Sequence, residues 1–332
     1  MIKYIKKIII TFSALILIFT SSFSFAGNYK IIFKNEALEK SLKNSESNEP
    51  VKGSDFIYSG DGAGVLKVLD KDGNEVSTFI PHSLHIMSIK IDSSGNIYTS
   101  SVDQTVKKSD SDGNIIWSFS GHTNQVRGLD IDSSGNVYTA SNDSTVKKLD
   151  NNGNEIWTFS EHSGFVNDVA VDSSGNLYTA SNDRKIMKVD SNGNKIWEFN
   201  GHGSNVQAVD VDNNGNIYSG SKDDTVKKID ANGNLIWTFA GHNDDVDDVI
   251  VDNNGNVYSA SRDQTIRKID SDGNEIWSFT GHSATIWALS VDAAGNVYSG
   301  SSDQTVKKID SNGNEIWSFT GHGSAVLSVS NK

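Results

Sequence analysis

A unit of 40 residues repeats along most of this 332-residue chain and constrains its fold more than any other feature. Nearly every copy carries a histidine, usually after a glycine, and a tryptophan five residues before it. The histidines are His82, His122, His162, His202, His242, His282 and His322, and the tryptophans are Trp117, Trp157, Trp197, Trp237, Trp277 and Trp317. A period near 40 in a β-rich chain is typical of a propeller or another closed array, because each unit must stack on its neighbours to bury a core.

One unit, residues 121–160, shows the pattern of four antiparallel strands. Val, Ile, Tyr, Thr and Trp are concentrated at 126–131, 137–141, 145–149 and 155–160, which favours strands there. Two of the intervening turns have the form Asp-x-x-Gly-Asn, in which Asp bonds to its own backbone and Gly takes a positive φ. Four such strands make one propeller blade, and blades stack around an axis.

The two ends of the array complete one blade together. The first unit starts in mid-blade, with strands expected at 56–59, 65–69 and 76–79, and the last unit stops after one strand at 325–330. Joining them removes the open sheet edges that a linear array would expose. Residues 51–332 are therefore predicted to form an all-β, seven-bladed β-propeller of 40-residue, four-stranded repeats, closed by a composite blade of three N-terminal strands and one C-terminal strand.

The first 26 residues predict a signal peptide. Three lysines precede an apolar run at 8–19, and a small-x-small cleavage site ends at Ala26. An uncleaved membrane anchor is the alternative, although the run is shorter than the roughly 20 apolar residues that span a bilayer. Cleavage would leave a polar linker at 27–50, with room for a short strand and a helix, and a mature chain with no membrane span, which we expect in the periplasm or secreted.

The composition excludes several classes of function. The chain has no cysteine, which rules out disulfides, thiolate catalysis and cysteine-ligated metal sites. Its net charge of −13 argues against binding to the phosphate backbone of nucleic acids. We expect a monomer whose partner is a protein or a peptide.

The Gly-His pairs, together with Ser-Ser-Asp-Gln-Thr-Val at 301–306, resemble the repeats of WD40 propellers. The resemblance implies that the histidine, a Ser or Thr of the second strand and the turn Asp form a buried hydrogen-bonded set in each blade. Residues such as Leu149 and Ile229 stand where that family has a tryptophan, so each set has three members. The implied sets are His122, Thr139 and Asp143; His162, Thr179 and Asp183; His202, Ser219 and Asp223; His242, Ser259 and Asp263; and His282, Ser299 and Asp303.

The fourth strand resembles a second family. Residues 310–317 carry the Asp-x-x-Gly-x-x-x-Trp element of quinoprotein-like (PQQ-like) propellers, a class that includes the outer-membrane assembly propeller of Gram-negative bacteria. The resemblance implies that this tryptophan packs between neighbouring blades. The first unit departs from the pattern, with Ala63, Ser77 and Pro81 in place of the turn Asp, the Trp and the Gly. We expect the composite blade to lack one Asp–His hydrogen bond and to be the least stable.

Positions that vary between otherwise similar repeats are candidates for partner recognition, since the blade itself does not require them. By the WD40 resemblance they gather at the mouth of the channel on one face. Aromatic and Arg residues anchor interfaces most often. For Trp287, packing between blades is the alternative. An acidic stretch at 243–248 favours a basic partner, with a plain solvated loop as the alternative. The predicted partner-binding residues are Trp287, Phe165, Arg127, Arg262, Met87, His85, Gln207, Asp245, Asp247 and Lys222.

No catalytic, cofactor or metal site is predicted. Each histidine has an aspartate at a fixed offset, which favours structural pairs over a ring of metal ligands. The turns at 110–114 and 270–274 resemble the start of a calcium loop but lack the terminal Glu of an EF-hand, so hairpin turns explain them better. The favoured function is an exported non-catalytic scaffold; an envelope-assembly propeller is the alternative, and a propeller enzyme acting on carbohydrate or peptide is less favoured.

Overall fold

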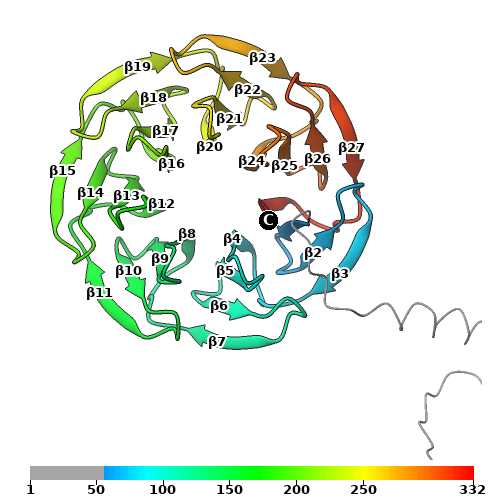
Figure 1. Cartoon of the computed structure of the whole chain (residues 1–332), viewed down its shortest axis with the longest axis horizontal. Coiled ribbons are helices and arrows are strands. Elements are labelled where there is room, and N and C mark those ends of the chain that lie inside the picture. Colours follow the sequence, from blue (N-terminus) through cyan, green and yellow to red (C-terminus); the bar gives the residue numbers. More distant parts are fainter. Residues whose placement is uncertain (1–55) are drawn as a thin grey trace, which may run out of the picture. The chain divides into compact units, whose positions relative to one another are not determined.

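The computed structural model describes residues 56–332, which form a ring of seven four-stranded antiparallel sheets (Figure 1). All regular structure in these residues is β, and they contain no apolar helix of the length needed to cross a membrane. The predicted all-β, seven-bladed propeller is thereby confirmed. The signal peptide at 1–26 and the linker at 27–50 lie outside the described residues.

The strands fall into four concentric sets, and those nearest the axis line the channel. The innermost strands are β4 (Ile86–Ile91), β8 (Val126–Ile131), β12 (Val166–Val171), β16 (Val206–Val211), β20 (Val246–Val251), β24 (Ile286–Val291) and β28 (Val326–Asn331). The second strands, buried throughout, are β1 (Ile57–Asp61), β5 (Ile97–Ser101), β9 (Val137–Ser141), β13 (Leu177–Ser181), β17 (Ile217–Ser221), β21 (Val257–Ser261) and β25 (Val297–Ser301).

The two outer sets complete the blades. The third strands are β2 (Leu66–Leu69), β6 (Val106–Ser109), β10 (Val146–Leu149), β14 (Ile186–Val189), β18 (Val226–Ile229), β22 (Ile266–Ile269) and β26 (Val306–Ile309). The outermost are β3 (Glu75–Phe79), β7 (Ile115–Phe119), β11 (Glu155–Phe159), β15 (Lys195–Phe199), β19 (Leu235–Phe239), β23 (Glu275–Phe279) and β27 (Glu315–Phe319). We number blades 1–6 in chain order from β4–β7 to β24–β27, and call β28-β1-β2-β3 the composite blade.

The hairpin turns form as their sequence predicts. In the turn between β8 and β9, Oδ1 of Asp132 accepts the N–H groups of Ser134 and Asn136, both at 2.9 Å. Gly135 follows with φ of 79°, a conformation that residues with a Cβ rarely adopt. The Asp side chain thus supplies the bonds of the turn, and Gly supplies its backbone geometry.

The hydrophobic core lies between blades. One cluster combines Tyr138 and Val146 of blade 2 with Val166 and Leu177 of blade 3. The fourth-strand tryptophans extend this packing, as the PQQ-like resemblance implied: Nε1 of Trp117 donates to a carbonyl of the next blade at 3.0 Å. A blade therefore has no complete core of its own and depends on its two neighbours.

The composite blade closes the ring as predicted. Strand β1 pairs with β28 in antiparallel register, with Tyr58 opposite Ser330. Trp317 then donates through Nε1 to the carbonyl of Lys71 at 3.0 Å, which repeats across the closure the bond that links the other blades. The two ends of the propeller thus share one sheet.

The prediction that the composite blade lacks an Asp–His hydrogen bond is wrong. Asp61 supplies it, with Oδ2 3.0 Å from Nδ1 of His322, while Oγ of Ser59 lies 2.8 Å from Nε2. Other blades have Ser at the position of Asp61. From there, Asp61 also accepts the N–H groups of Ala63 and Val65, so one carboxylate does the work of the usual Ser and Asp together.

Candidate functional site

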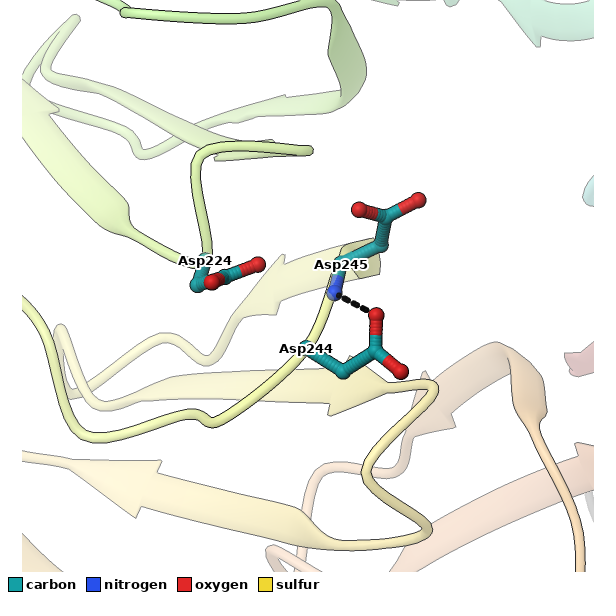
Figure 2. A group of neighbouring side chains, drawn as sticks. All are labelled: Asp224, Asp244 and Asp245. Atoms are coloured by element: carbon teal, nitrogen blue, oxygen red, sulfur yellow. Dashed lines mark hydrogen bonds between the residues drawn. The ribbon is translucent and has the colours of Figure 1, made fainter.

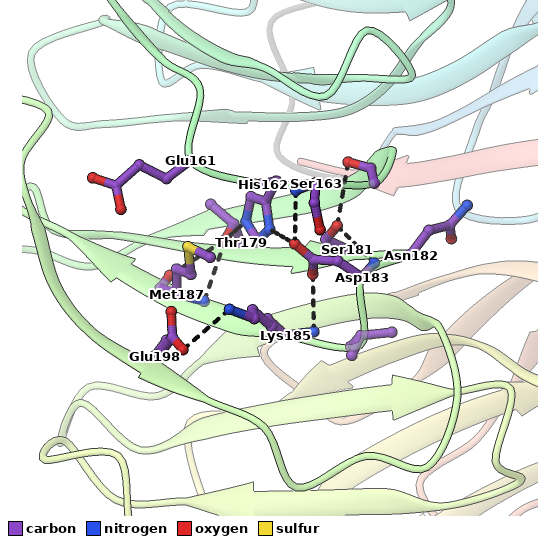
Figure 3. Close-up of polar contacts among 12 residues, drawn as sticks. Glu161, His162, Ser163, Thr179, Ser181, Asn182, Asp183, Lys185, Met187 and Glu198 are labelled. Atoms are coloured by element: carbon purple, nitrogen blue, oxygen red, sulfur yellow. Dashed lines mark hydrogen bonds and ion pairs between the residues drawn. The ribbon is translucent and has the colours of Figure 1, made fainter.

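Each blade holds a buried histidine between two polar partners. In blade 2, Nε2 of His122 lies 2.8 Å from Oγ1 of Thr139, and Nδ1 lies 2.8 Å from Oδ2 of Asp143. Figure 3 shows the corresponding set in blade 3. The remaining implied sets make the same two contacts at 2.7–2.9 Å: His162 with Thr179 and Asp183, His202 with Ser219 and Asp223, His242 with Ser259 and Asp263, and His282 with Ser299 and Asp303.

The charges of these sets support a structural role. Burial would raise the pKa of Asp303, but hydrogen bonds from Thr305 and His282 outweigh it and bring that pKa to about 2. Burial lowers the pKa of His282, and Asp303 offsets only part of that effect. Because both ring nitrogens are engaged within the blade, these histidines have no lone pair to offer an incoming ligand.

The central channel contains a cavity of about 690 Å³, lined mainly by the innermost strands. In every blade a β-bulge leaves the second residue of the innermost strand unpaired, and bulges redirect side chains. We call the end of the channel where these strands begin the channel mouth. The seven bulged residues all line the cavity there: Met87, Arg127, Asn167, Gln207, Asp247, Trp287 and Leu327.

The structure places the predicted partner-binding residues in two groups. Those that line the cavity are Trp287, Arg127, Met87, His85, Gln207 and Asp247. Phe165, Arg262, Asp245 and Lys222 lie outside its wall. Phe165 is 44% exposed, a large fraction for a phenylalanine, whereas the other three take part in an ionic network that borders the mouth.

That network partly neutralises the acidic stretch at 243–248. Arg262 bonds to Asp247 through Nε at 2.8 Å and Nη2 at 3.2 Å, and its Nη1 lies 3.2 Å from Asp245. Nζ of Lys222 lies 3.3 Å from the same Asp245 carboxylate. Two of the acidic side chains therefore already have cationic partners within the chain.

Trp287 is fixed in position by its neighbours. Its Nε1 donates to Oγ of Ser302 at 2.6 Å, and the Arg262 guanidinium lies 5.3 Å from the centre of its ring. A ring that is held on its edge and on one face loses little conformational entropy when a ligand packs against it. Trp287 thus offers a preformed apolar surface in the channel wall.

Sequence reasoning missed a group of carboxylates deeper in the channel. Each accepts a backbone N–H of the next innermost strand, at distances of 2.6–3.0 Å: Asp130 from Val171, Asp168 from Val209, Asp210 from Val251, and Asp248 from Leu289. These N–H groups lie on strand edges that face the channel, where they have no further strand to pair with. The aspartates therefore cap the inner edges of four blades.

Three of these carboxylates are costly to ionise. Burial raises the pKa of Asp168 to about 7 and that of Asp210 to about 6, and it raises the pKa of Asp248 well above its usual range. Asp130 has a cationic partner: Nζ of Lys90 lies 3.2 Å away, and this contact is the main reason that the pKa of Lys90 is raised. These aspartates are visible in the sequence, but they occupy two different positions of the innermost strand in alternate repeats. Comparing one repeat position at a time therefore does not reveal them as a group.

One further acidic group lies near the mouth. Figure 2 shows Asp224, Asp244 and Asp245, whose carboxylate oxygens come within 4.8 Å of one another, the only such group of potential metal ligands in residues 56–332. The N–H of Asp245 donates to Asp244 at 2.8 Å. Since Asp245 is bridged to Lys222 and Arg262, the group is partly neutralised without a metal.

The ring, its histidine sets and its inter-blade tryptophans define a repeat β-propeller. The family model described as outer membrane protein assembly factor BamB matches residues 142–251 and 222–332, which together span more than half of the chain. The chain therefore belongs to this family of propeller repeats. The model described as WD domain, G-beta repeat matches residues 113–149, so both predicted resemblances are confirmed.

The curated proteins contain no match to this chain. Among solved structures, the computationally designed Ika8 protein resembles it with a TM-score of 0.67 and 24% sequence identity. The alignment covers 83% of this chain and 87% of the designed chain. This likeness shows that the two chains share a fold.

Proposed function

We propose that this protein is a non-catalytic scaffold that binds a segment of a partner protein at the channel mouth. The observation that carries the proposal is the ring of seven bulged residues, which differ from blade to blade while the residues that build the blades repeat. A cavity of about 690 Å³ with a fixed aromatic wall is of the size and character of binding sites for small ligands or a few side chains.

The absence of catalysis is part of the same proposal. The buried His, Ser or Thr, and Asp sets resemble triads in composition, but they recur in every blade and their hydrogen bonds are used within the blade. The channel aspartates bond to backbone N–H groups of the next blade. A hydrolase and lyase screen with and without calcium tests this point, and turnover that is lost on changing cavity residues would contradict it.

The location we propose is the cell envelope, with export directed by residues 1–26. The signal-like sequence and the family description support this location. The same description favours a more specific candidate, an assembly factor that supports outer-membrane proteins. Fractionation of the source cells, with co-purification of outer-membrane assembly components, tests it; a source without an outer membrane would contradict it.

A crosslinking experiment tests the site. A photoreactive amino acid replaces Gln207 at the mouth, and in a matched variant it replaces Asn213, which lies beyond the other end of the same strand. We expect one discrete crosslinked partner from the first variant and none from the second. Trp287→Ala should abolish the crosslink while leaving the melting temperature within a few degrees. Equal crosslinking from both positions would show that the mouth is not the site.

A further inference from the structure

The residues of the channel mouth are sorted by polarity around the ring. Strands β24, β28 and β4 are consecutive neighbours, and their bulged residues are Trp287, Leu327 and Met87, which we call the apolar arc. The next four strands contribute Arg127, Asn167, Gln207 and Asp247, which we call the polar arc. A ligand that fills the mouth therefore meets an apolar wall on one side and polar groups on the other.

Within the polar arc, two of the four side chains, Asp247 and Asn167, are already engaged. Asp247 is held by Arg262, as described above. Nδ2 of Asn167 donates to Asn182 and to the carbonyl of Val206, both at 2.7 Å. These contacts fix the side chains in place and use much of their hydrogen-bonding capacity.

Arg127 is the charged side chain of the polar arc that is not engaged in this way. Its guanidinium makes no hydrogen bond or ion pair with any residue between 56 and 332, although it lines the cavity and is half-buried. Burial is the main reason that its pKa is lowered, and the charges that influence it include Asp247 and Arg262 from the blade three places along. The guanidinium therefore extends toward the channel, where its five N–H donors have no acceptor within the described chain.

Almost every charged side chain of the cavity wall has a bonded partner. Lys90 is paired with Asp130, Asp247 with Arg262, and the deeper carboxylates with backbone N–H groups. Among the charged side chains that line the cavity in the described residues, Arg127 alone is without a bonded partner. The group that complements this wall is an anion with two acceptor oxygens, since a carboxylate matches the fork of a guanidinium.

We propose that the channel mouth binds an acidic amphipathic peptide segment, whose carboxylate pairs with Arg127 while a neighbouring aliphatic or aromatic side chain packs on the apolar arc. This inference rests on the proposed function and specifies the partner's chemistry. It replaces the expectation of a basic partner, because Asp245 and Asp247 are held by Lys222 and Arg262 and are not available to a second cation. The carboxylate belongs to Asp, Glu or a chain terminus.

The test starts from random decapeptides displayed on phage and selected against the purified protein. We expect the enriched peptides to carry Asp, Glu or a free terminal carboxylate within two positions of Leu, Ile, Phe or Trp. In calorimetry, Arg127→Gln should weaken their binding roughly ten- to a hundredfold, the effect of losing a charged hydrogen-bonded pair. Arg184→Gln is the matched control, because this exposed arginine lies outside the cavity and should leave affinity unchanged.

A second measurement separates a direct contact from a general effect of charge. Replacing the peptide carboxylate by its amide should weaken binding to the native protein by the same factor as Arg127→Gln. Combining both changes should then add little, because the same contact is removed twice. Additive losses would overturn the assignment of Arg127.

The other outcomes are distinguishable. Enrichment of Lys- or Arg-rich peptides that Trp287→Ala weakens would overturn this inference and leave the proposed function standing. Peptides whose binding is unchanged by both Trp287→Ala and Arg127→Gln would contradict the proposed site. If no peptide is enriched but octanoate binds in an Arg127-dependent way, the carboxylate chemistry stands with a free acid as its source, and the scaffold proposal falls.

Discussion

The buried histidines link the stability of the propeller to pH. Because burial lowers the pKa of His202 and His282, the unfolded chain binds protons more readily than the folded one as pH falls through about 6.5. Asp303, whose pKa of about 2 lies below its unfolded value, adds stability that is present above pH 4 and lost toward pH 2. Both effects destabilise the folded protein as the pH falls.

Asp168, Asp210 and Asp248 in the channel act in the opposite sense. Asp168 has a folded pKa of about 7, above its unfolded value, so its contribution is most favourable at low pH and is lost as pH rises through 7. The pH dependence of stability is thus the sum of two opposing sets of groups. Single substitutions can separate them.

Asp168→Asn should stabilise the protein at pH 8 by about 2 kcal/mol, because Asn keeps an acceptor for the N–H of Val209 without a buried charge. The gain should be clearly smaller at pH 5, where the folded aspartate is already protonated, and should vanish only below about pH 4, where the unfolded aspartate is protonated as well. Urea unfolding at both pH values measures this. Asp272→Asn is the control, since Asp272 is exposed and other repeats carry Asn there; an equal gain at pH 5 and pH 8 would contradict the account.

Asp61→Ala should destabilise the protein by about 2 kcal/mol, because it leaves His322 and two backbone N–H groups without their acceptor. Asp143→Ala, which breaks the corresponding pair in blade 2, should have a similar effect. Denaturant midpoints of the two variants make the comparison. A loss for Asp143→Ala with no loss for Asp61→Ala would show that the composite blade does not depend on its substitute pair.

At the scale of the element, blades are joined by a tryptophan and a glycine. Trp117 packs against Gly153 of the next blade so closely that a Cβ on this glycine would lie 2.9 Å from the ring. The composite blade has Ser77 instead of the tryptophan, and its Phe79 takes the place of that ring against Gly113. An aromatic ring therefore still packs on a glycine at this interface, although the tryptophan of the motif is absent.

Trp197→Phe should cost about 1 kcal/mol beyond any change in packing, because the bond from Nε1 to the carbonyl of Ala231 is lost while the apolar ring remains. Ile196→Thr, on the neighbouring and half-exposed position of β15, serves as the control and should change little. Thermal unfolding followed by circular dichroism measures both. Equal melting temperatures for the tryptophan variant and the native protein would argue that the inter-blade bond adds nothing.

Blade 3 shows how an element keeps its ionic contacts while its residues are exchanged. In three of the other blades a third-strand lysine pairs with a fourth-strand glutamate, as in Lys147 with Glu155 at 3.0 Å. In blade 3 the lysine is replaced by Met187, and Glu198 instead meets Lys185 at 3.1 Å (Figure 3). Exposed pairs of this kind contribute little stability, which explains why the exchange is tolerated.

For the whole molecule, ring closure replaces two open edges by one shared sheet. Deleting residues 321–332 removes β28 and with it the innermost strand of the composite blade. We expect the melting temperature to fall by more than 10 °C, or the protein to aggregate, because the exposed edge of β1 can pair with another chain. Analytical ultracentrifugation and thermal unfolding measure both outcomes. Unchanged stability and a monomeric state would contradict the closure mechanism.

The repeat made the architecture predictable, because its period, turn residues and incomplete ends all depend on local sequence. The residues of the channel mouth could also be predicted, since comparing the repeats identifies positions that the blade does not require. The contacts of the variable side chains could not be predicted: Arg262 bonds to Asp247 within blade 5, and its stacking on Trp287 of blade 6 depends on how the two blades are angled. Asp61 escaped notice because its carboxylate reaches His322 from a different position of the repeat.

The sharing of one blade by both ends also sets the order of events during synthesis. Ser59 and His322, which are in contact in the finished blade, are separated by 263 positions. A nascent chain therefore carries β1–β3 as an incomplete sheet until β28 leaves the ribosome, and the ring can close only after all seven repeats have been made. Until that strand is added, the newly made protein is an unclosed ring whose exposed sheet edges chaperones can bind.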